Sequence, residues 1–188
     1  MNRMQQDHRK LLDLIRKEAY FQEKIILSSG KESDYYIDAR RVTLSAQGAY
    51  LCASFILEIL RDDDFEAIGG PTLGADPMLG AIAVLSFQNN RPINTFIIRK
   101  SPKAHGKQQQ VEGPLLKEGS RVVLIDDVAT TGKAFLQSLD VLESMRVKVL
   151  KAVCLVDRKE GAGEALARRG CPLVALFDIS EIQRPSKS

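Results

Sequence analysis

The spacing of apolar residues in the first part of the chain predicts helices separated by a pair of strands. Leu11 and Ile15 lie one helical turn apart in a mostly polar segment, which predicts an amphipathic opening helix. Residues 24–40 predict a strand, a turn rich in serine and glycine, and a second strand that carries aromatic residues. Helical spacing returns over residues 46–60, directly after Ser45, which is a suitable N-cap.

From residue 65 onward, short runs rich in valine, isoleucine and leucine alternate with helical patterns. The predicted strands are 65–70, 93–99, 122–126, 147–157 and 173–178, and the predicted helices are 76–87, 133–145 and 161–169. Strands that are almost continuously apolar are buried on both faces, and their alternation with helices is typical of a parallel sheet. The pattern therefore predicts an α/β fold in which helices flank a central, mostly parallel sheet.

Composition and charge are those of an ordinary globular protein. The 188 residues are 44% hydrophobic and 27% charged, which is enough for one domain with a sizeable core. The net charge of +3 comes from 27 basic and 24 acidic residues, a balance too even to indicate a nucleic-acid-binding protein. We find no internal repeat and no linker, so we expect a single domain over residues 1–188.

Cysteine usage and the absence of long apolar runs favour a cytoplasmic location. Cys52, Cys154 and Cys171 are scattered in apolar runs, so we expect buried thiols rather than disulfides or a zinc site. The polar N-terminus has no apolar core of a secretory signal, and no apolar run approaches the ~20 residues that span a bilayer. These features predict a reducing compartment and no membrane contact.

The stretch RVVLIDDVATTGKAF carries the clearest chemical signal. In open α/β sheets, ligands bind beyond the carboxyl ends of strands, and free N–H groups at a helix N-terminus attract anions. Thr130, Thr131 and Gly132 precede a predicted helix, so we expect a cradle for a phosphate group. Asp126 and Asp127 cannot face that phosphate, so they must accept hydrogen bonds from sugar hydroxyls or bind Mg²⁺ beside it. A phosphorylated sugar satisfies both parts.

Three alternatives to a sugar-phosphate site are weaker. Asp and Thr residues also cap helices without binding any ligand. The Walker pattern GxxxxGK[ST] of a nucleotide-binding loop is absent. GAGEAL at residues 161–166 lacks the third glycine of a dinucleotide-binding fingerprint. Helix capping without a ligand is the one of these three alternatives that the sequence leaves open.

The apolar run, the two acids and the following ATTG resemble the phosphoribosyl-diphosphate (PRPP) signature of type I phosphoribosyltransferases. The resemblance implies the type I fold, with a small hood-like N-terminal region over residues 1–45 and the core over residues 46–188. It implies that Asp126 and Asp127 hold the ribose hydroxyls of PRPP, which itself holds most of the Mg²⁺ cofactor. The implied 5-phosphate loop comprises Val128, Ala129, Thr130, Thr131, Gly132, Lys133 and Ala134.

Further stretches resemble the orotate branch of this family, in the same order along the chain. They are SSGKESDYYID (28–38), GGPTLGADPM (69–78), RKSPKAHG (99–106) and VDRKEGA (156–162). The resemblance implies transfer of the phosphoribosyl group from PRPP to orotate, with release of diphosphate. The implied orotate contacts, among which Arg158 binds the planar base and its carboxylate, are Tyr35, Tyr36, Thr130 and Arg158.

The polar segment 99–113 interrupts the alternation of strands and helices and is long for a loop in a compact domain. Unaided, its positive charge could be only a solvated surface. The family resemblance identifies it as a mobile basic lid that stabilises the leaving diphosphate and excludes water. It implies PRPP contacts for Arg99, Lys100, Lys103 and His105, with Lys103 and His105 catalytic alongside the acid pair. In this family the lid usually completes the neighbouring subunit's site, which implies a homodimer.

Several positions depart from the pattern of many bacterial orotate enzymes. Ser28 stands where they have a lysine, and the nearest cation is Lys31. Leu73 and Gly74 stand where they have a Tyr-Lys pair, so the diphosphate loses one side-chain cation. The alternatives are another nucleobase phosphoribosyltransferase, such as a purine enzyme, or a PRPP-sensing regulator of the same fold. Thr130 disfavours a hypoxanthine-guanine enzyme, which has an aspartate at that position.

Overall fold

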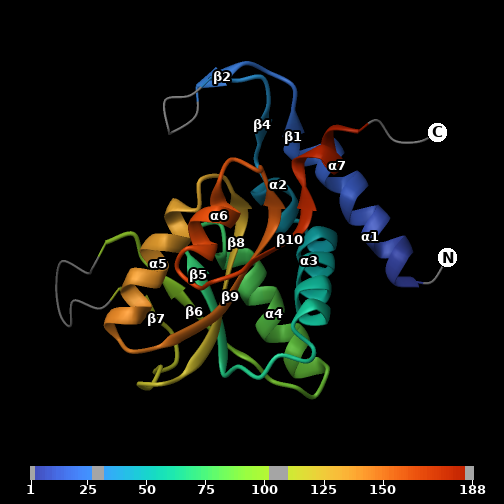
Figure 1. The fold of residues 1–188 in the computed structure, drawn as a ribbon. Helices are drawn as coiled ribbons and strands as arrows, with labels where there is room; N and C mark the ends of the chain where they lie inside the picture. Colours follow the sequence, from blue (N-terminus) through green and yellow to red (C-terminus); the bar gives the residue numbers. More distant parts are fainter. Residues whose placement is uncertain (1–2, 27–31, 102–109, 185–188) are drawn as a thin grey trace.

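The central element of the molecule is a six-stranded sheet (Figure 1). The computed structural model describes residues 3–26, 32–101 and 110–184, with only the backbone described at residues 25–26. The strands of the sheet are β5 (Ala67–Pro71), β6 (Asn94–Ile98), β7 (Val111–Glu112), β8 (Arg121–Ala129), β9 (Lys148–Asp157) and β10 (Leu173–Asp178). Their order is β10-β9-β8-β5-β6-β7, and every described pairing is parallel except that of β6 with β7. The prediction of a mostly parallel central sheet is confirmed.

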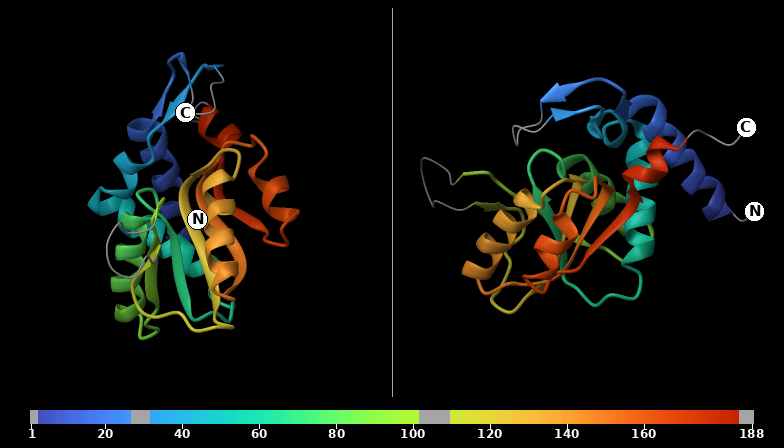
Figure 2. Two further views of the ribbon diagram at one scale, coloured as in Figure 1. Left: turned by 90° about the vertical axis from the view of Figure 1, so that its left-hand side faces the viewer. Right: turned by 45° about the horizontal axis from the view of Figure 1, so that its top comes forward.

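Helices cover both faces of the sheet (Figure 2). One face carries α3 (Ala46–Ile59) and α4 (Asp76–Gln88), and the other carries α5 (Lys133–Ser144) and α6 (Ala162–Ala167). The amino-terminal α1 (Arg3–Leu14) packs against α3, and the short α7 (Ile179–Gln183) follows β10. No helix in the described part of the chain combines the length and apolar character needed to cross a membrane.

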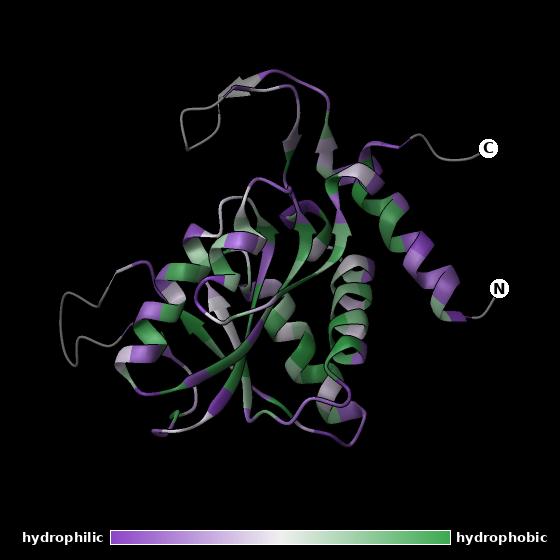
Figure 3. Ribbon diagram, in the orientation of Figure 1, coloured by the Kyte–Doolittle hydropathy of each residue, from purple (hydrophilic) through white to green (hydrophobic). Residues whose placement is uncertain are grey.

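Apolar side chains of β8 point alternately to the two faces of the sheet, so helices must cover both faces. Val123 and Ile125 pack into the core formed with α3 and α4, whereas Val122 and Leu124 pack with α5. All four side chains are fully buried. Figure 3 shows hydrophobic residues along the central strands, as expected for a parallel sheet that is covered on both sides. The predicted buried cysteines lie in the same core, and all three are free thiols.

The N-terminal segment differs from its predicted pair of strands. It forms two short antiparallel ribbons, which pair β1 (Tyr20–Phe21) with β4 (Tyr36–Ile37) and β2 (Ile25–Ile26) with β3 (Glu32–Ser33). The second predicted strand is divided because the Ser33 hydroxyl donates to the carbonyl oxygen of Tyr35 at 2.8 Å and turns the chain locally. The opening helix also changes form, because α1 continues as a π-helical turn over Ile15–Ala19.

Candidate active site

The acid pair lies near the carboxyl end of β8, an interior strand of the central sheet. β8 continues past its predicted end at residue 126 and reaches Ala129. Its pairing with β5 stops at Leu124, whereas its pairing with β9 continues to Ala129. The ladder with β9 therefore keeps the polar residues in extended conformation, and the turn after β5 lies beside their carboxylates. Ligands of open α/β sheets bind beyond such strand ends.

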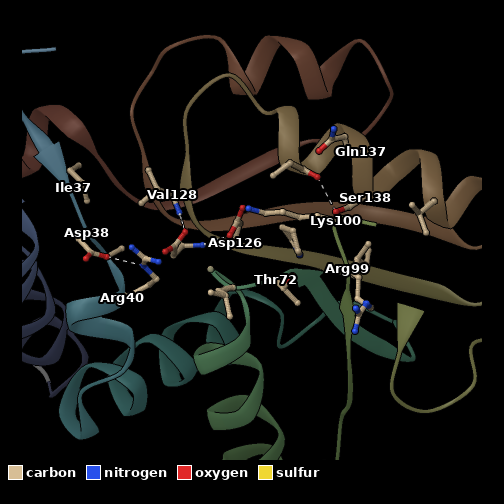
Figure 4. A pocket seen from close by; sticks show the side chains of 18 of the residues that line it. Ile37, Asp38, Arg40, Thr72, Arg99, Lys100, Asp126, Val128, Gln137 and Ser138 are labelled. Carbon is tan, nitrogen blue, oxygen red and sulfur yellow. Dashed lines mark hydrogen bonds and ion pairs between the residues drawn. The ribbon is translucent and has the colours of Figure 1, made fainter. Parts of the chain in front are cut away.

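A cavity of about 470 Å³ opens in front of the acid pair (Figure 4). It is bounded by β4, the short helix α2 (Arg40–Thr43), the turn after β5, the start of the predicted lid, β8 and α5. The predicted site residues that line it are Tyr36, Arg99, Lys100, Asp126, Asp127, Val128 and Ala134. Lys103 and His105, together with Ser28 and Lys31, lie outside the described residues.

Burial raises the pKa values of both acids. The pKa of Asp126 is raised mainly by burial and then by the charge of Asp127. The pKa of Asp127 is also raised by burial, although the N–H of Val128 and the charge of Arg40 oppose the shift. The Asp127 N–H donates to Asp126 Oδ1 at 2.9 Å, and the Val128 N–H donates to Asp127 Oδ1 at 2.8 Å. The pair is thus held in a position where donors from a ligand would stabilise the ionised carboxylates.

We predict that Asp126→Asn raises thermal stability. A raised carboxyl pKa means that the folded state binds the proton more tightly than the unfolded state, so stability falls as pH rises through that pKa. Above that pKa the ionised Asp126 therefore destabilises the fold, and Asn removes this penalty. We expect a gain of about 1 kcal/mol, or a rise of about 2–4 °C in Tm, at pH 8.

The gain should shrink as pH falls, because protonation removes the same penalty from the native protein. Asp62→Asn on the exposed turn after α3 provides a control with the same change in charge and no expected rise in Tm. Thermal unfolding at pH 8 and pH 5 checks both variants. An Asp126→Asn protein with a lower Tm at pH 8 than the native protein would contradict a destabilising carboxylate.

The predicted phosphate loop joins β8 to α5. Gly132 has φ of 80°, in the left-handed region, and a Cβ there would lie 3.2 Å from the Cα atom of Ala162. The Ala162 N–H donates to the carbonyl oxygen of Thr130 at 3.2 Å, and the Arg158 N–H donates to that of Ala129 at 2.9 Å. No side chain caps α5 at Gly132, so its first N–H groups are available to an anion.

Two of the predicted base-side residues, Tyr35 and Arg158, form a second cluster, which does not line the cavity. The Arg158 guanidinium lies over the Tyr35 ring, 4.5 Å from its centre. Its Nη2 donates to Ser33 Oγ at 3.1 Å, and its Nε donates to Glu160 Oε1 at 2.8 Å. Arg158 is only 6% exposed. The cluster therefore fixes the arginine between the end of β9 and the N-terminal ribbons, while Tyr36 faces the cavity instead.

The structure places further residues at the site, which are not among the predicted site residues. Asp38 and Arg40 follow β4 and line the cavity, and Gln137 lines it from α5. Glu160 and Ser33 contact Arg158. The charged pair within IDAR, directly after a predicted strand, was a usable signal for Asp38 and Arg40. Ser33 and Glu160 lie in the quoted stretches SSGKESDYYID and VDRKEGA, which alone do not assign them a role, and Gln137 lies in none of the quoted stretches.

The donor set fits a magnesium ion that arrives with a phosphorylated ligand. Among the described residues, no group of three or more His, Cys, Asp or Glu side chains could hold a metal on its own. Mg²⁺ keeps several waters and usually binds through one or two carboxylates together with substrate phosphates. Asp126 and Asp127 beside a phosphate loop match that requirement, in agreement with the Mg²⁺ that the resemblance to type I phosphoribosyltransferases implies.

Comparisons with known proteins agree with this geometry. Residues 46–171 match the phosphoribosyl transferase domain family. The orotate phosphoribosyltransferase of Nostoc sp. is 42% identical over 94% of this chain and 85% of its own length. The structure of the Mycobacterium tuberculosis orotate phosphoribosyltransferase with Fe(III) dicitrate has a TM-score of 0.83 and 35% identity, covering 95% of this chain and 99% of that one. The same enzyme in complex with PRPP has a TM-score of 0.79 and 30% identity at the same coverage. The chain therefore belongs to the phosphoribosyltransferase family, within its orotate phosphoribosyltransferase branch.

Proposed function

We propose that the protein transfers the phosphoribosyl group of PRPP to orotate, giving orotidine 5-phosphate and diphosphate in the synthesis of pyrimidine nucleotides. The observation that carries this proposal is the acid pair near the carboxyl end of β8, with Asp126 buried and Asp127 half-buried, directly before the predicted phosphate loop. A ribose 5-phosphate unit spans such a site, because its hydroxyls donate to carboxylates and its phosphate accepts from N–H groups. Relatives named as orotate phosphoribosyltransferases support orotate as the acceptor.

The reaction exchanges one bond at the anomeric carbon for another. The deprotonated ring nitrogen of orotate forms the new bond to C1 as the C1–O bond to diphosphate breaks, and the bonding electrons leave with the diphosphate. Positive charge develops on the ribose in the transition state, next to Asp126 and Asp127. Their carboxylates hold the ribose hydroxyls and stabilise that charge in a water-poor cavity. Asp126 is 8% exposed, so little solvent screens this interaction.

Arg158 is the proposed partner of the orotate carboxylate. Its guanidinium is already oriented by Tyr35, Ser33 and Glu160. A planar fork of donors recognises a carboxylate on a planar ring. Thr130 and Tyr36 are proposed to complete the base site, since the Thr130 loop is anchored to the same segment through its bond with Ala162.

The diphosphate is proposed to leave beneath the basic lid. Arg99 and Lys100 line the cavity at the start of this segment, and Lys103 and His105 would follow as the catalytic cations. Mg²⁺ bound to PRPP would neutralise part of the diphosphate charge as it leaves. The lid is proposed to come from the partner in a homodimer. Exposed Leu44 and Leu73 line an apolar hollow next to the cavity, which is suited to contact with a second subunit.

A substrate screen tests the proposed function. With PRPP and Mg²⁺ present, the protein is offered orotate, uracil, hypoxanthine, guanine and adenine in separate assays. We expect kcat/KM for orotate to exceed that for every other base by at least about 100-fold, because bases without a carboxylate lose the charged contact with Arg158. Turnover of a purine without turnover of orotate would indicate the alternative nucleobase enzyme. Tight PRPP binding without turnover of any base would indicate a PRPP-sensing regulator.

A further inference from the structure

We propose that Arg40 binds the diphosphate group of PRPP, and that it supplies the cation missing at position 74. This inference rests on the proposed function, because it assumes that PRPP occupies the cavity. The charged residues that line the described cavity are Asp38, Arg40, Arg99, Lys100, Asp126 and Asp127. A ligand with phosphate groups at both ends needs cations to offset the repulsion of these acids. Arg40 acts electrostatically on Asp127, and it also lines a neighbouring hollow together with Leu73 of the turn after β5.

Gly74 explains why the turn after β5 cannot provide the cation itself. A Cβ atom at this position would lie 2.2 Å from Asp126 Oδ1 and 2.5 Å from Asp127 Oδ1. Any side chain here would therefore displace the carboxylates that hold the ribose. The close approach of the turn to β8 leaves the turn with backbone groups only at this position. A cation for the diphosphate must then reach the cavity from another element.

Arg40 reaches the cavity from α2. It lies at the start of that helix, and its Nε donates to Asp38 Oδ1 at 3.0 Å. No described hydrogen bond engages its terminal nitrogens, so both remain available to an anion. Figure 4 shows Arg40 and Asp38 on one side of Asp126, with Gln137 and Ser138 of α5 on the other. The guanidinium is thus oriented by Asp38 and presented at the mouth of the cavity.

The electrostatic environment indicates that Arg40 lies near Asp127, which is assigned to the ribose. The hydrogen bond and charge of Asp38 raise the pKa of Arg40, with a smaller contribution from Asp127. Arg40 in turn lowers the pKa of Asp127 against the effect of burial. Since Asp127 is assigned to a ribose hydroxyl, a group beside it is close to C1, which carries the diphosphate. The Arg40 side chain is 44% exposed, so a bound diphosphate can contact it without repacking the core.

Arg40→Gln tests this role through binding rather than turnover alone. Calorimetry measures the Kd values of PRPP with Mg²⁺, of diphosphate with Mg²⁺, and of orotidine 5-phosphate, which has the ribose phosphate but no diphosphate. We expect PRPP and diphosphate to bind about 10–100-fold more weakly, the size of a lost hydrogen bond between charged groups. Orotidine 5-phosphate should change by less than about 3-fold, because its contacts with the acid pair remain. Arg40→Lys should restore part of the PRPP affinity.

Arg41→Gln is the matched control. Arg41 is the next residue of the same helix, but its guanidinium lies over the Phe21 ring, 4.9 Å from the ring centre. Its loss should leave the Kd of all three ligands unchanged. Equal weakening of PRPP and orotidine 5-phosphate in Arg40→Gln would overturn the proposal, because Arg40 would then act by supporting the acid pair. Unchanged PRPP binding would overturn it as well. The measurements with PRPP and with diphosphate need no base, so failure of orotate turnover in the native protein would contradict the proposed function separately.

Discussion

Replacing both acids, Asp126→Asn together with Asp127→Asn, should lower kcat/KM for the PRPP reaction by at least about 1000-fold in a protein that still folds. Each carboxylate is assigned to the ribose, and the loss of one such charged hydrogen bond in a buried site costs about 2–4 kcal/mol. The two losses will not add fully, because the acids act on the same sugar. Steady-state kinetics with varied PRPP measures the effect, and circular dichroism confirms the fold.

A second double variant tests whether the loss of activity depends on where the negative charges are removed rather than on how many are removed. Asp140→Asn together with Glu143→Gln removes two negative charges from the exposed face of α5, where both residues bind Arg169. We expect this protein to keep its activity within about 2-fold, because exposed ion pairs contribute little. Normal PRPP turnover in the Asp126-Asp127 double variant would contradict the role of the acid pair.

Mixing two inactive variants should restore about 25% of native activity if the lid of one subunit serves the site of the other. Lys103→Ala is expected to disable the lid, and Asp127→Asn to disable the ribose contacts. In a mixed dimer both defects then meet in one site, and the other site is intact. Random re-association in equal amounts makes half of the dimers mixed, so one site in four is fully native in a closed two-fold dimer. Activity is measured after the variants are unfolded and refolded together.

Asp126→Asn mixed with Asp127→Asn is the control for this experiment. Both changes affect the same set of ribose contacts, so every site in the mixture keeps one defect and no activity should return. If the lid instead closed over its own subunit, the first mixture would also stay inactive. That result would contradict the shared site while leaving the proposed reaction untouched.

Much of the core fold could be predicted because parallel strands buried on both faces are continuous apolar runs. The segments of β5, β6, β9 and β10 were located from such runs, and those of α3 to α6 from their helical patterns. The end of β8 was not, because DDVA is too polar to resemble a buried strand, and only its ladder with β9 extends it to Ala129. The strand β7 and the helix α2 are too short to produce a periodic pattern. The division at residues 45 and 46 stays a prediction.

The same holds for the site: residues that are contiguous in sequence could be predicted, whereas contacts between distant segments could not. The acid pair and the phosphate loop are contiguous in sequence, so their types and spacing were enough to predict them. The constraint on Gly74 arises because the turn after β5 contacts β8, and no pattern around position 74 reveals it. Similarly, the bond from Arg158 to Ser33 joins residues 125 positions apart. Contacts of this kind depend on the whole fold, so the orienting role of Ser33 could not be predicted.

The central claim is that this cavity joins PRPP to orotate, and the stoichiometry of one reaction tests it most directly. Orotate loss is followed by its ultraviolet absorbance while released diphosphate is measured in the same sample. We expect one diphosphate for each orotate consumed, and no reaction when PRPP or Mg²⁺ is omitted. Diphosphate release that is unchanged by omitting orotate, or no orotate loss in the complete mixture, would contradict the account.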